Sequence, residues 1–178
     1  FYYSDSNLVE NNEINRLNRT TFSTGYGIYA LNSVNNKFIG NKIHNLKGST
    51  NYPIYLGNSQ NTSGKESMIV NNAIYDLNNT GTTYGIYLSG TRDYVTVLHN
   101  TISLVTDLNG TSTQRGIYAL NAPSNHEFKN NLISITGSGS GTSHGIYFNS
   151  TSTSLELSHN NYYVDPNKSN SYVGYYSG

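Results

Sequence analysis

The sequence predicts an all-β protein that folds as a right-handed parallel β-helix, a solenoid of about six rungs of 28–31 residues with three parallel sheets. Three observations predict this fold. A six-residue frame (apolar, any, any, Asn, any, apolar) recurs six times, and a second motif, Gly-Ile-Tyr, recurs between its copies. No segment has the apolar spacing of three and four residues that a helix requires. A repeat period of about 20 to 50 residues is typical of stacked architectures.

The six-residue frame defines two apolar columns. Strands of one rung should pair with the equivalent strands of the next at about 4.8 Å, so that equivalent apolar residues stack and face inward. Alternation at period two, as at Val95 and Val97, supports the strands. The first column is Val9, Phe38, Ile69, Val97, Phe128 and Leu157, and the second is Ile14, Ile43, Ile74, Ile102, Ile133 and Tyr162.

The Asn of each frame should form a ladder along the stack. It falls where the chain turns sharply between two strands, and Asn tolerates left-handed backbone conformations. A buried amide without partners would cost a few kcal/mol, so each amide should bond its counterpart one rung away. The predicted ladder is Asn12, Asn41, Asn72, Asn100, Asn131 and Asn160.

The Gly-Ile-Tyr motif supplies a third strand in each rung. One copy reads Pro53-Ile54-Tyr55, and the last is read as Gly174-Tyr175-Tyr176. The third inward column is then Ile28, Ile54, Ile86, Ile117, Ile146 and Tyr175. The connections before this motif vary in length and are rich in Gly, Ser, Thr and Asn. We expect the segments 46–51, 78–83, 107–114 and 137–143 to be surface loops at one corner.

A tyrosine stripe is the sharpest candidate for a binding surface. If the preceding Ile points inward, strand alternation turns the Tyr outward. The stripe would be about 24 Å long and could stack on sugar rings or pack on a partner. Alternatively, like residues stack only because they stabilise their cross-strand neighbours by about 0.2–1 kcal/mol. The absence of Trp weighs against strong sugar binding. The stripe contains Tyr29, Tyr55, Tyr87, Tyr118, Tyr147 and Tyr176.

Composition excludes several classes of function. Ten Lys plus Arg balance ten Asp plus Glu, so no basic patch is expected to bind nucleic acid. The absence of Cys excludes disulfides, zinc–thiolate sites and Cys nucleophiles. No stretch approaches the roughly 18 apolar residues of a membrane span, so we expect no membrane insertion. We also expect no cofactor.

The titratable residues do not predict a catalytic or metal site. The ten acidic residues scatter over different repeat positions. The best combinations are Asp76, Asp93 beside Arg92, and Asp107 with Arg115, and we interpret all of them as solvated surface charges. His99 and His159 share one column but lie two rungs apart, about 10 Å, which is too far for one metal ion. They are interpreted as turn or surface residues.

The Gly-Ile-Tyr element and the Asn-x-Ile frame resemble the parallel β-helix repeats of the pectin-lyase-like superfold. The resemblance covers the whole chain and is closest to Asn-rich repeats of large secreted or surface-anchored bacterial proteins. The run Asn160–Asp165 is similar to segments of such proteins from Bacteroidetes-type bacteria. This superfold hosts lyases, hydrolases, epimerases, adhesins and passive stalks, so the resemblance implies a fold and a location at the cell exterior, and no single activity.

Residues 1–178 are expected to form a single domain, an internal segment of a longer chain, because the sequence begins without Met and residues 172–178 begin a further repeat. The leading hypothesis is a non-catalytic extracellular or cell-surface segment that acts as a stalk, an adhesin or a carbohydrate-contacting surface. Its expected partners are polysaccharide or neighbouring domains of the same chain.

Two alternatives remain open at this stage. One is part of a polysaccharide lyase or glycoside hydrolase, which a cleft with two carboxylates within about 10 Å would favour. The other is a fibre-forming segment that self-associates end to end through unpaired strand edges.

Overall fold

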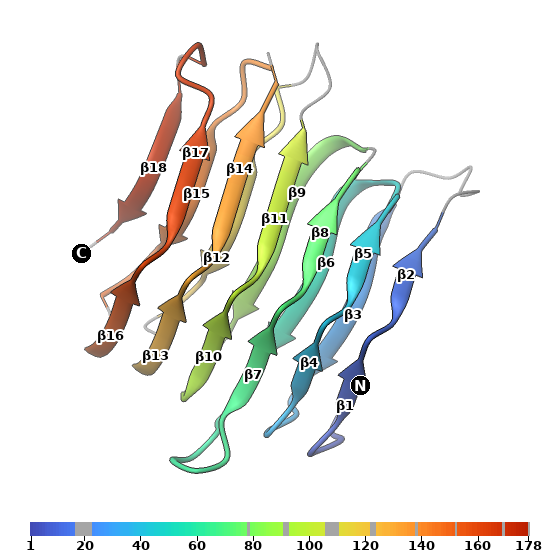
Figure 1. Cartoon of the computed structure of the whole chain (residues 1–178), viewed down its shortest axis with the longest axis vertical. Helices are drawn as coiled ribbons and strands as arrows, with labels where there is room; N and C mark the ends of the chain where they lie inside the picture. The colour runs from blue at the N-terminus through green and yellow to red at the C-terminus, as the bar shows by residue number, and fades with distance from the viewer. Residues whose placement is uncertain are drawn as a thin grey trace.

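The chain forms a parallel β-solenoid of three six-stranded sheets (Figure 1). The computed structural model describes residues 1–16, 23–77, 79–90, 93–105, 111–121, 124–137, 139–151, 153–168 and 170–177. Within these ranges all regular secondary structure is β. The predicted all-β fold with three parallel sheets is therefore confirmed, and the six strands of each sheet correspond to the six predicted rungs.

Each rung contributes one strand to each sheet. The first sheet contains β1 (Leu8–Glu10), β4 (Lys37–Ile39), β7 (Ser67–Val70), β10 (Val95–Leu98), β13 (Ser124–Lys129) and β16 (Thr153–Ser158). The second contains β2 (Glu13–Asn15), β5 (Lys42–His44), β8 (Ala73–Tyr75), β11 (Thr101–Val105), β14 (Leu132–Thr136) and β17 (Asn161–Val164). The third contains β3 (Thr24–Leu31), β6 (Gly48–Gly57), β9 (Asn79–Ser89), β12 (Gln114–Ala119), β15 (Ser143–Phe148) and β18 (Ser171–Tyr176).

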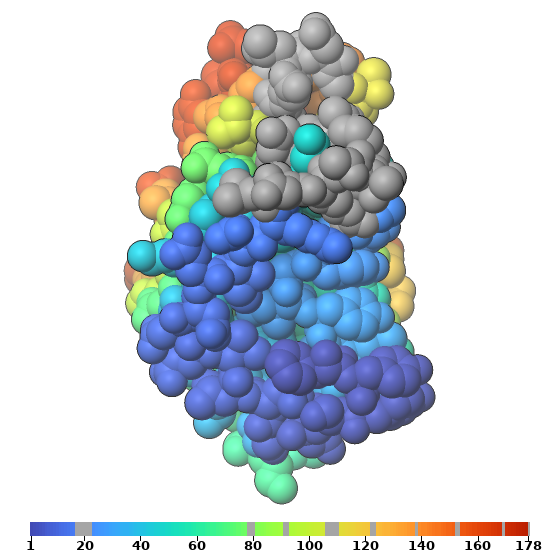
Figure 2. Space-filling model, turned by 90° about the vertical axis from the view of Figure 1, so that its right-hand side faces the viewer, coloured from blue at the N-terminus to red at the C-terminus, as the bar shows by residue number. Residues whose placement is uncertain are grey.

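The first two sheets follow each other along the front of Figure 1, and the third sheet lies behind them. Figure 2 looks along the stack from the N-terminal end, where residues of the first rung lie nearest to the viewer. The part of the chain that the structure describes contains no helix long and apolar enough to cross a lipid bilayer.

The core is the space between the three sheets, and the predicted columns fill it. Both columns of the six-residue frame stack in the predicted register, as in Phe38 opposite Ile69 and Ile43 opposite Ile74. Their central members are fully buried, whereas Leu157 in the last rung is 46% exposed because no further strand covers it. A fourth inward column, which the frame did not reveal, contains Ala30, Leu56, Leu88, Ala119 and Phe148.

The Asn ladder is continuous from the first rung to the last. The Asn72 amide nitrogen donates to Asn100 Oδ1 at 3.0 Å and to the Phe38 carbonyl at 2.9 Å. The Asn72 backbone N–H donates to the same Asn100 oxygen at 3.0 Å. Asn41, Asn100 and Asn131 repeat this pattern with the next rung. Each inner amide thus uses both donors and receives two hydrogen bonds, so its burial leaves no polar atom unsatisfied.

The turn that carries the ladder differs from the prediction in one detail. The residue in the left-handed conformation is the one before the ladder Asn, not the Asn itself. Its φ is 65° at Gly40, 56° at His99 and 55° at His159. Asn and Gly enter this conformation at low cost, and Asn11, Asn71 and Asn130 occupy the position in the other rungs. The interpretation of His99 and His159 as turn residues is confirmed.

Two predictions about the third sheet are wrong. The last copy of the motif is shifted by one residue, because Ile146 pairs with Gly174 and Tyr147 pairs with Tyr175. This register stacks Tyr175 on Tyr147, with ring centroids 4.6 Å apart, so Tyr175 leaves the inward column in which it was predicted and takes the place of Tyr176 in the stripe. The second error concerns the corner segments. β6 begins at Gly48 and β9 at Asn79, so most of segments 46–51 and 78–83 is strand, since neighbouring rungs supply their backbone partners.

The ladder predicts a large effect of replacing one central Asn. Asn100→Ala would deprive both Asn72 donors of their acceptor and the Ile69 carbonyl of its donor. Each buried group left unsatisfied costs about 1–3 kcal/mol, so we expect a loss of about 3 kcal/mol or more in the free energy of unfolding. Urea denaturation followed by circular dichroism measures it. Asn161→Ala, at an exposed position of β17, should have little effect, and equal losses in both variants would contradict the role of the ladder.

Candidate functional site

The outer side of the third sheet carries two adjacent columns of large side chains, which we call the aromatic face. The tyrosine column contains Tyr29, Tyr55, Tyr87, Tyr118, Tyr147 and Tyr175. The mixed column contains Tyr26, Tyr52, Tyr84, Arg115, His144 and Tyr172. Five of the six predicted stripe residues therefore share one column. The mixed column was not predicted, although its members are the residues directly before the Gly of the motif or its equivalent.

The Gly of the motif explains why two residues three positions apart lie on the same side of the sheet. Pairing passes from Tyr26–Tyr52 to Ile28–Ile54 with no pair at Gly27, so this position is an extra residue in the alternation. A Cβ at Gly27 would lie 2.5 Å from the Pro53 carbonyl oxygen and 2.8 Å from Ile43 Cγ2. Gly avoids this crowding in four rungs, and Pro53 and Val173 occupy the position in the other two.

The rings of the aromatic face stack along the solenoid. Tyr26, Tyr52 and Tyr84 have successive centroids 5.2 Å apart and are 13° from parallel. Tyr29 and Tyr55 are 4.8 Å apart at 23°. Because one ring covers the next, each inner ring is only partly exposed and offers solvent its edge and not its face. The surface that a ligand would meet is therefore largely a row of ring edges and phenol groups.

Burial in this stack raises the pKa of four of its phenols, those of Tyr26, Tyr29, Tyr52 and Tyr87. It raises the pKa of Tyr52 to about 12, with a smaller contribution from the neighbouring Tyr84. Burial also raises the pKa of Tyr87 well above its ordinary value. A protonated phenol is both a hydrogen-bond donor and an acceptor. Near neutral pH the face is thus an uncharged, hydrogen-bonding aromatic surface along most of its length.

A column of Thr borders the aromatic face on the side where the strands begin. Thr24 pairs with Thr50, and Thr50 pairs with Thr82. In the next two rungs Thr113 and Thr142 directly precede β12 and β15, whose first residues continue the same pairing. This Thr column adds methyl and hydroxyl groups beside the rings and widens the polar, uncharged surface.

The regular stack changes at Arg115. Its guanidinium carbon lies 4.2 Å from the Tyr147 centroid and 4.5 Å from the Tyr118 centroid. The Tyr118 ring stacks on Tyr84 of the other column, at 5.2 Å and 21°, and meets Tyr147 at 68°. With the Tyr84 centroid 5.5 Å away, Arg115 is a cation held among three rings, each such contact contributing about 0.5–2 kcal/mol.

His144 lies next to Arg115 in the mixed column and is buried. Its ring stacks on Tyr172 at 5.1 Å and meets the edge of Tyr147 at 4.8 Å. Burial, and secondarily the positive charge of Arg115, lowers the pKa of His144 to about 4. His144 is thus neutral at pH 7, and it behaves as another flat ring in the stack.

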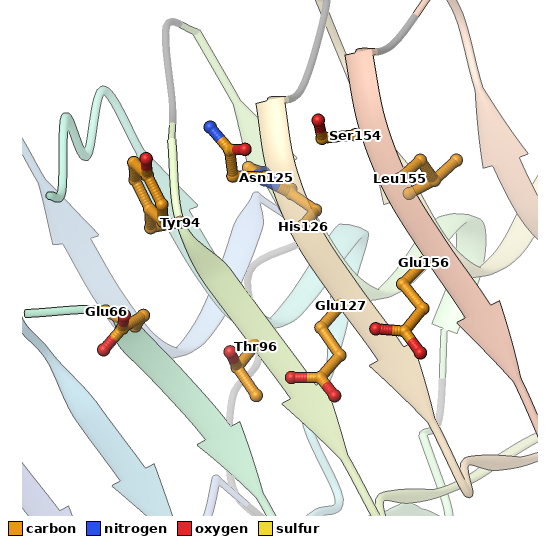
Figure 3. A pocket seen from close by; sticks show the side chains of 9 residues that line it. All are labelled: Glu66, Tyr94, Thr96, Asn125, His126, Glu127, Ser154, Leu155 and Glu156. Carbon is orange, nitrogen blue, oxygen red and sulfur yellow. The ribbon is translucent and has the colours of Figure 1, made fainter. Parts of the chain in front are cut away.

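A second candidate site is an acidic pair on the outer side of the first sheet, Glu127 on β13 and Glu156 on β16. These residues are in register, and Lys129 Nζ bonds both carboxylates, at 2.5 and 2.7 Å. They line an open depression of about 460 Å³ together with Glu66, Tyr94 and the buried His126 (Figure 3). The interpretation that the acidic residues scatter over different repeat positions is wrong for this pair, because Glu127 and Glu156 occupy the same repeat position in two adjacent rungs.

The other charged combinations that the sequence suggested do not form a site among the described residues. Asp76 has φ 48° in the turn after β8, whereas Asp93 precedes β10 at another corner, where its carbonyl accepts a bond from Asn61. Arg92 and Asp107 lie outside the described residues. Within the described ranges no group of three or more His, Asp or Glu side chains could hold a metal ion.

His144 makes the stability of the fold sensitive to acid. Between its folded pKa of about 4 and the ordinary value of 6.5, the unfolded chain binds more protons, so stability falls as the pH drops through this window. At pH 5 the loss should reach about 2 kcal/mol. His144→Tyr, which matches most of its column, should reduce the difference between urea midpoints at pH 7 and pH 5.

His99→Asn is the matched control, because Asn71 and Asn130 occupy the same turn position in neighbouring rungs. If both variants keep the wild-type difference between the two pH values, then His144 does not cause it.

Comparison of the chain with curated proteins and with solved structures found no match. A protein-family model described as "Right handed beta helix region" matches residues 1–164. Its match extends over the six repeats of the frame and the whole of the first two sheets. This chain therefore belongs to the right-handed β-helix family.

Proposed function

We propose that this chain is a non-catalytic extracellular β-helix module that contacts polysaccharide through its aromatic face. The observation that carries the proposal is the aromatic face itself, two stacked columns that extend over all six rungs and remain partly exposed. The location at the cell exterior rests on the resemblance to secreted and surface-anchored repeat proteins. Within a larger protein, such a module would act as a stalk or as an adhesin.

A linear polymer suits this surface better than a small molecule. The face repeats one chemical pattern every rung, with centroids 4.6–5.2 Å apart along the tyrosine column. Polysaccharides present hydroxyl groups at regular intervals, and protonated phenols and Thr hydroxyls can donate to them and accept from them. Neither column contains a carboxylate, so this face offers no pair of carboxylates of the kind that glycoside hydrolysis uses.

The edge-on presentation of the rings predicts which part of Tyr matters. Tyr87→Phe with Tyr118→Phe keeps the stack but removes two hydroxyl groups, each worth about 0.5–1.5 kcal/mol in a hydrogen bond. We expect about tenfold weaker binding, measured by affinity gel electrophoresis against a panel of soluble neutral and charged polysaccharides.

Tyr163→Phe, an exposed position on the second sheet, is the matched control and should bind as the wild type does. The proposal is wrong if no polysaccharide of the panel retards the wild-type protein, or if the double Phe variant binds equally well. Circular dichroism of each variant verifies that the fold is kept.

The acidic pair supports a second candidate function, a glycoside hydrolase or polysaccharide lyase. Both Glu127 and Glu156 lie within 2.7 Å of the same Lys129 nitrogen, so the two carboxylates are as close as the pair of retaining glycosidases, about 5–5.5 Å. One carboxylate would act as the general acid and the other as the nucleophile. Lys129 would stabilise the negative charge of the nucleophilic carboxylate.

This second candidate predicts that the activity depends on both members of the pair. Glu127→Gln and Glu156→Gln should each reduce the release of new reducing ends, or of unsaturated products, by at least about 100-fold. Glu66→Gln is the control, since Glu66 lines the same depression and its carboxylate bonds the Gly64 N–H instead of Lys129. Absence of product from every polysaccharide of the panel would leave the non-catalytic proposal in place.

A further inference from the structure

We propose that Arg115 forms an anion subsite in the middle of the aromatic face and that this subsite binds a sulfate ester of the polysaccharide. The inference rests on the proposed function, because it assigns the chemistry of the ligand on the same surface. It goes beyond that function by naming one residue and one substituent. Three features of the described residues support it.

The first feature is the local change in the stack at this rung. Tyr29, Tyr55 and Tyr87 are within about 23° of parallel, whereas Tyr87 and Tyr118 are tilted by 58° and Tyr118 and Tyr147 by 68°. Tyr118 stacks on Tyr84 of the mixed column, and the guanidinium lies over the rings of both Tyr118 and Tyr147. The regular row of ring edges is therefore interrupted at one place, and a positive charge lies there.

The second feature is the charge balance of the face. Among the described residues Arg115 forms no salt bridge, and its neighbours in both columns are Tyr or the neutral His144. A cation that is held by rings keeps its full charge, and near a protein surface it attracts an anion more strongly than it would in bulk water. The net formal charge of the chain is zero, so a preference for anionic polymers would arise from this local field and not from a basic surface overall.

The third feature favours a sulfate over a carboxylate. Arg115 Nη1 donates to the Tyr84 hydroxyl at 3.3 Å, and Nε is buried with no hydrogen-bond partner in the structure. The planar side-on fork that Arg offers to a carboxylate needs Nε, so this fork is closed. A tetrahedral sulfate has oxygens that point in several directions. Its three terminal oxygens can accept from Nη2 and from phenol hydroxyls of neighbouring rungs together, whereas a carboxylate has only two oxygens for the same donors.

The test uses three soluble derivatives of one backbone: hydroxyethyl cellulose, carboxymethyl cellulose and cellulose sulfate, matched in chain length. Affinity gel electrophoresis or calorimetry gives the dissociation constant of the full chain for each polymer. We expect the wild type to bind cellulose sulfate about tenfold more tightly than the neutral polymer, as for one charge-assisted hydrogen bond, and more tightly than the carboxymethyl polymer. Added salt should reduce the preference.

Arg115→Tyr is the decisive variant, because Tyr occupies four of the six positions of the mixed column and should preserve the stack. We expect it to bind all three polymers within about twofold of the wild-type value for the neutral one. Lys37→Gln, which removes one exposed cation from β4 on the first sheet, should keep the preference for sulfate. Circular dichroism and the urea midpoint verify the fold of both variants.

Each outcome decides between the inference and the proposed function. If the wild type binds all three polymers equally, or if Arg115→Tyr keeps the preference, the anion subsite is wrong, while binding that the Tyr-to-Phe substitutions weaken still supports the aromatic face. If carboxymethyl cellulose binds best, the assignment to sulfate is overturned. If no polymer of this set or of the wider panel binds, both proposals are wrong.

Discussion

The hydrogen bonds of the Asn ladder set the register on which the rest of the structure depends. Each inner amide donates to the rung above and to a carbonyl of the rung below, and it accepts two bonds in return. A slip of one residue would leave these buried groups unsatisfied and would also turn the inward side chains of the flanking strands outward. Connections of unequal length can therefore be tolerated elsewhere in the rung, because the frame Val97–Ile102 and its equivalents restore the alignment once per turn.

Exact stacking has a direct consequence for the outer surface. Where a strand repeats a Tyr, as at Tyr29, Tyr55 and Tyr87, the rings lie over one another, so that the same contacts that stabilise the sheet also hide the ring faces. Under the proposed function, stability and ligand binding would use different parts of one side chain. The ring serves the stack, and the hydroxyl group and ring edge remain for solvent or a ligand. This division reconciles the two readings of the stripe, since a stabilising aromatic ladder can be a binding surface without exposing its faces.

The sequence was sufficient to predict the fold and one of the two columns of the aromatic face. Val97 and Asn100 belong to a six-residue frame whose internal spacing is the same in all six copies. A solenoid requires this constant spacing, and a constant spacing is visible in the sequence. The mixed column was missed because Arg115 and His144 interrupt its Tyr residues in two adjacent rungs, so the repeat is incomplete. Tyr176 was misplaced because the motif was aligned on Gly174, whereas ring stacking on Tyr147 selects Tyr175. The pair of Glu127 and Glu156 occurs in two rungs only, too few to form a repeat pattern.

Two of these misses, the mixed column and the acidic pair, share a physical cause. A residue that recurs in every rung, such as the ladder Asn, is fully explained by stacking, because each copy bonds the next. A residue that departs from its column breaks that arrangement and must find other partners, as Arg115 does among three rings and Lys129 does between two carboxylates. Both departures carry charge in a chain where only 11% of residues are charged. Arg115 lies in the fourth rung and Lys129 in the fifth, on different sheets. Arg115 and Lys129 are therefore the positions at which this chain offers charged groups that the repeating residues alone do not supply.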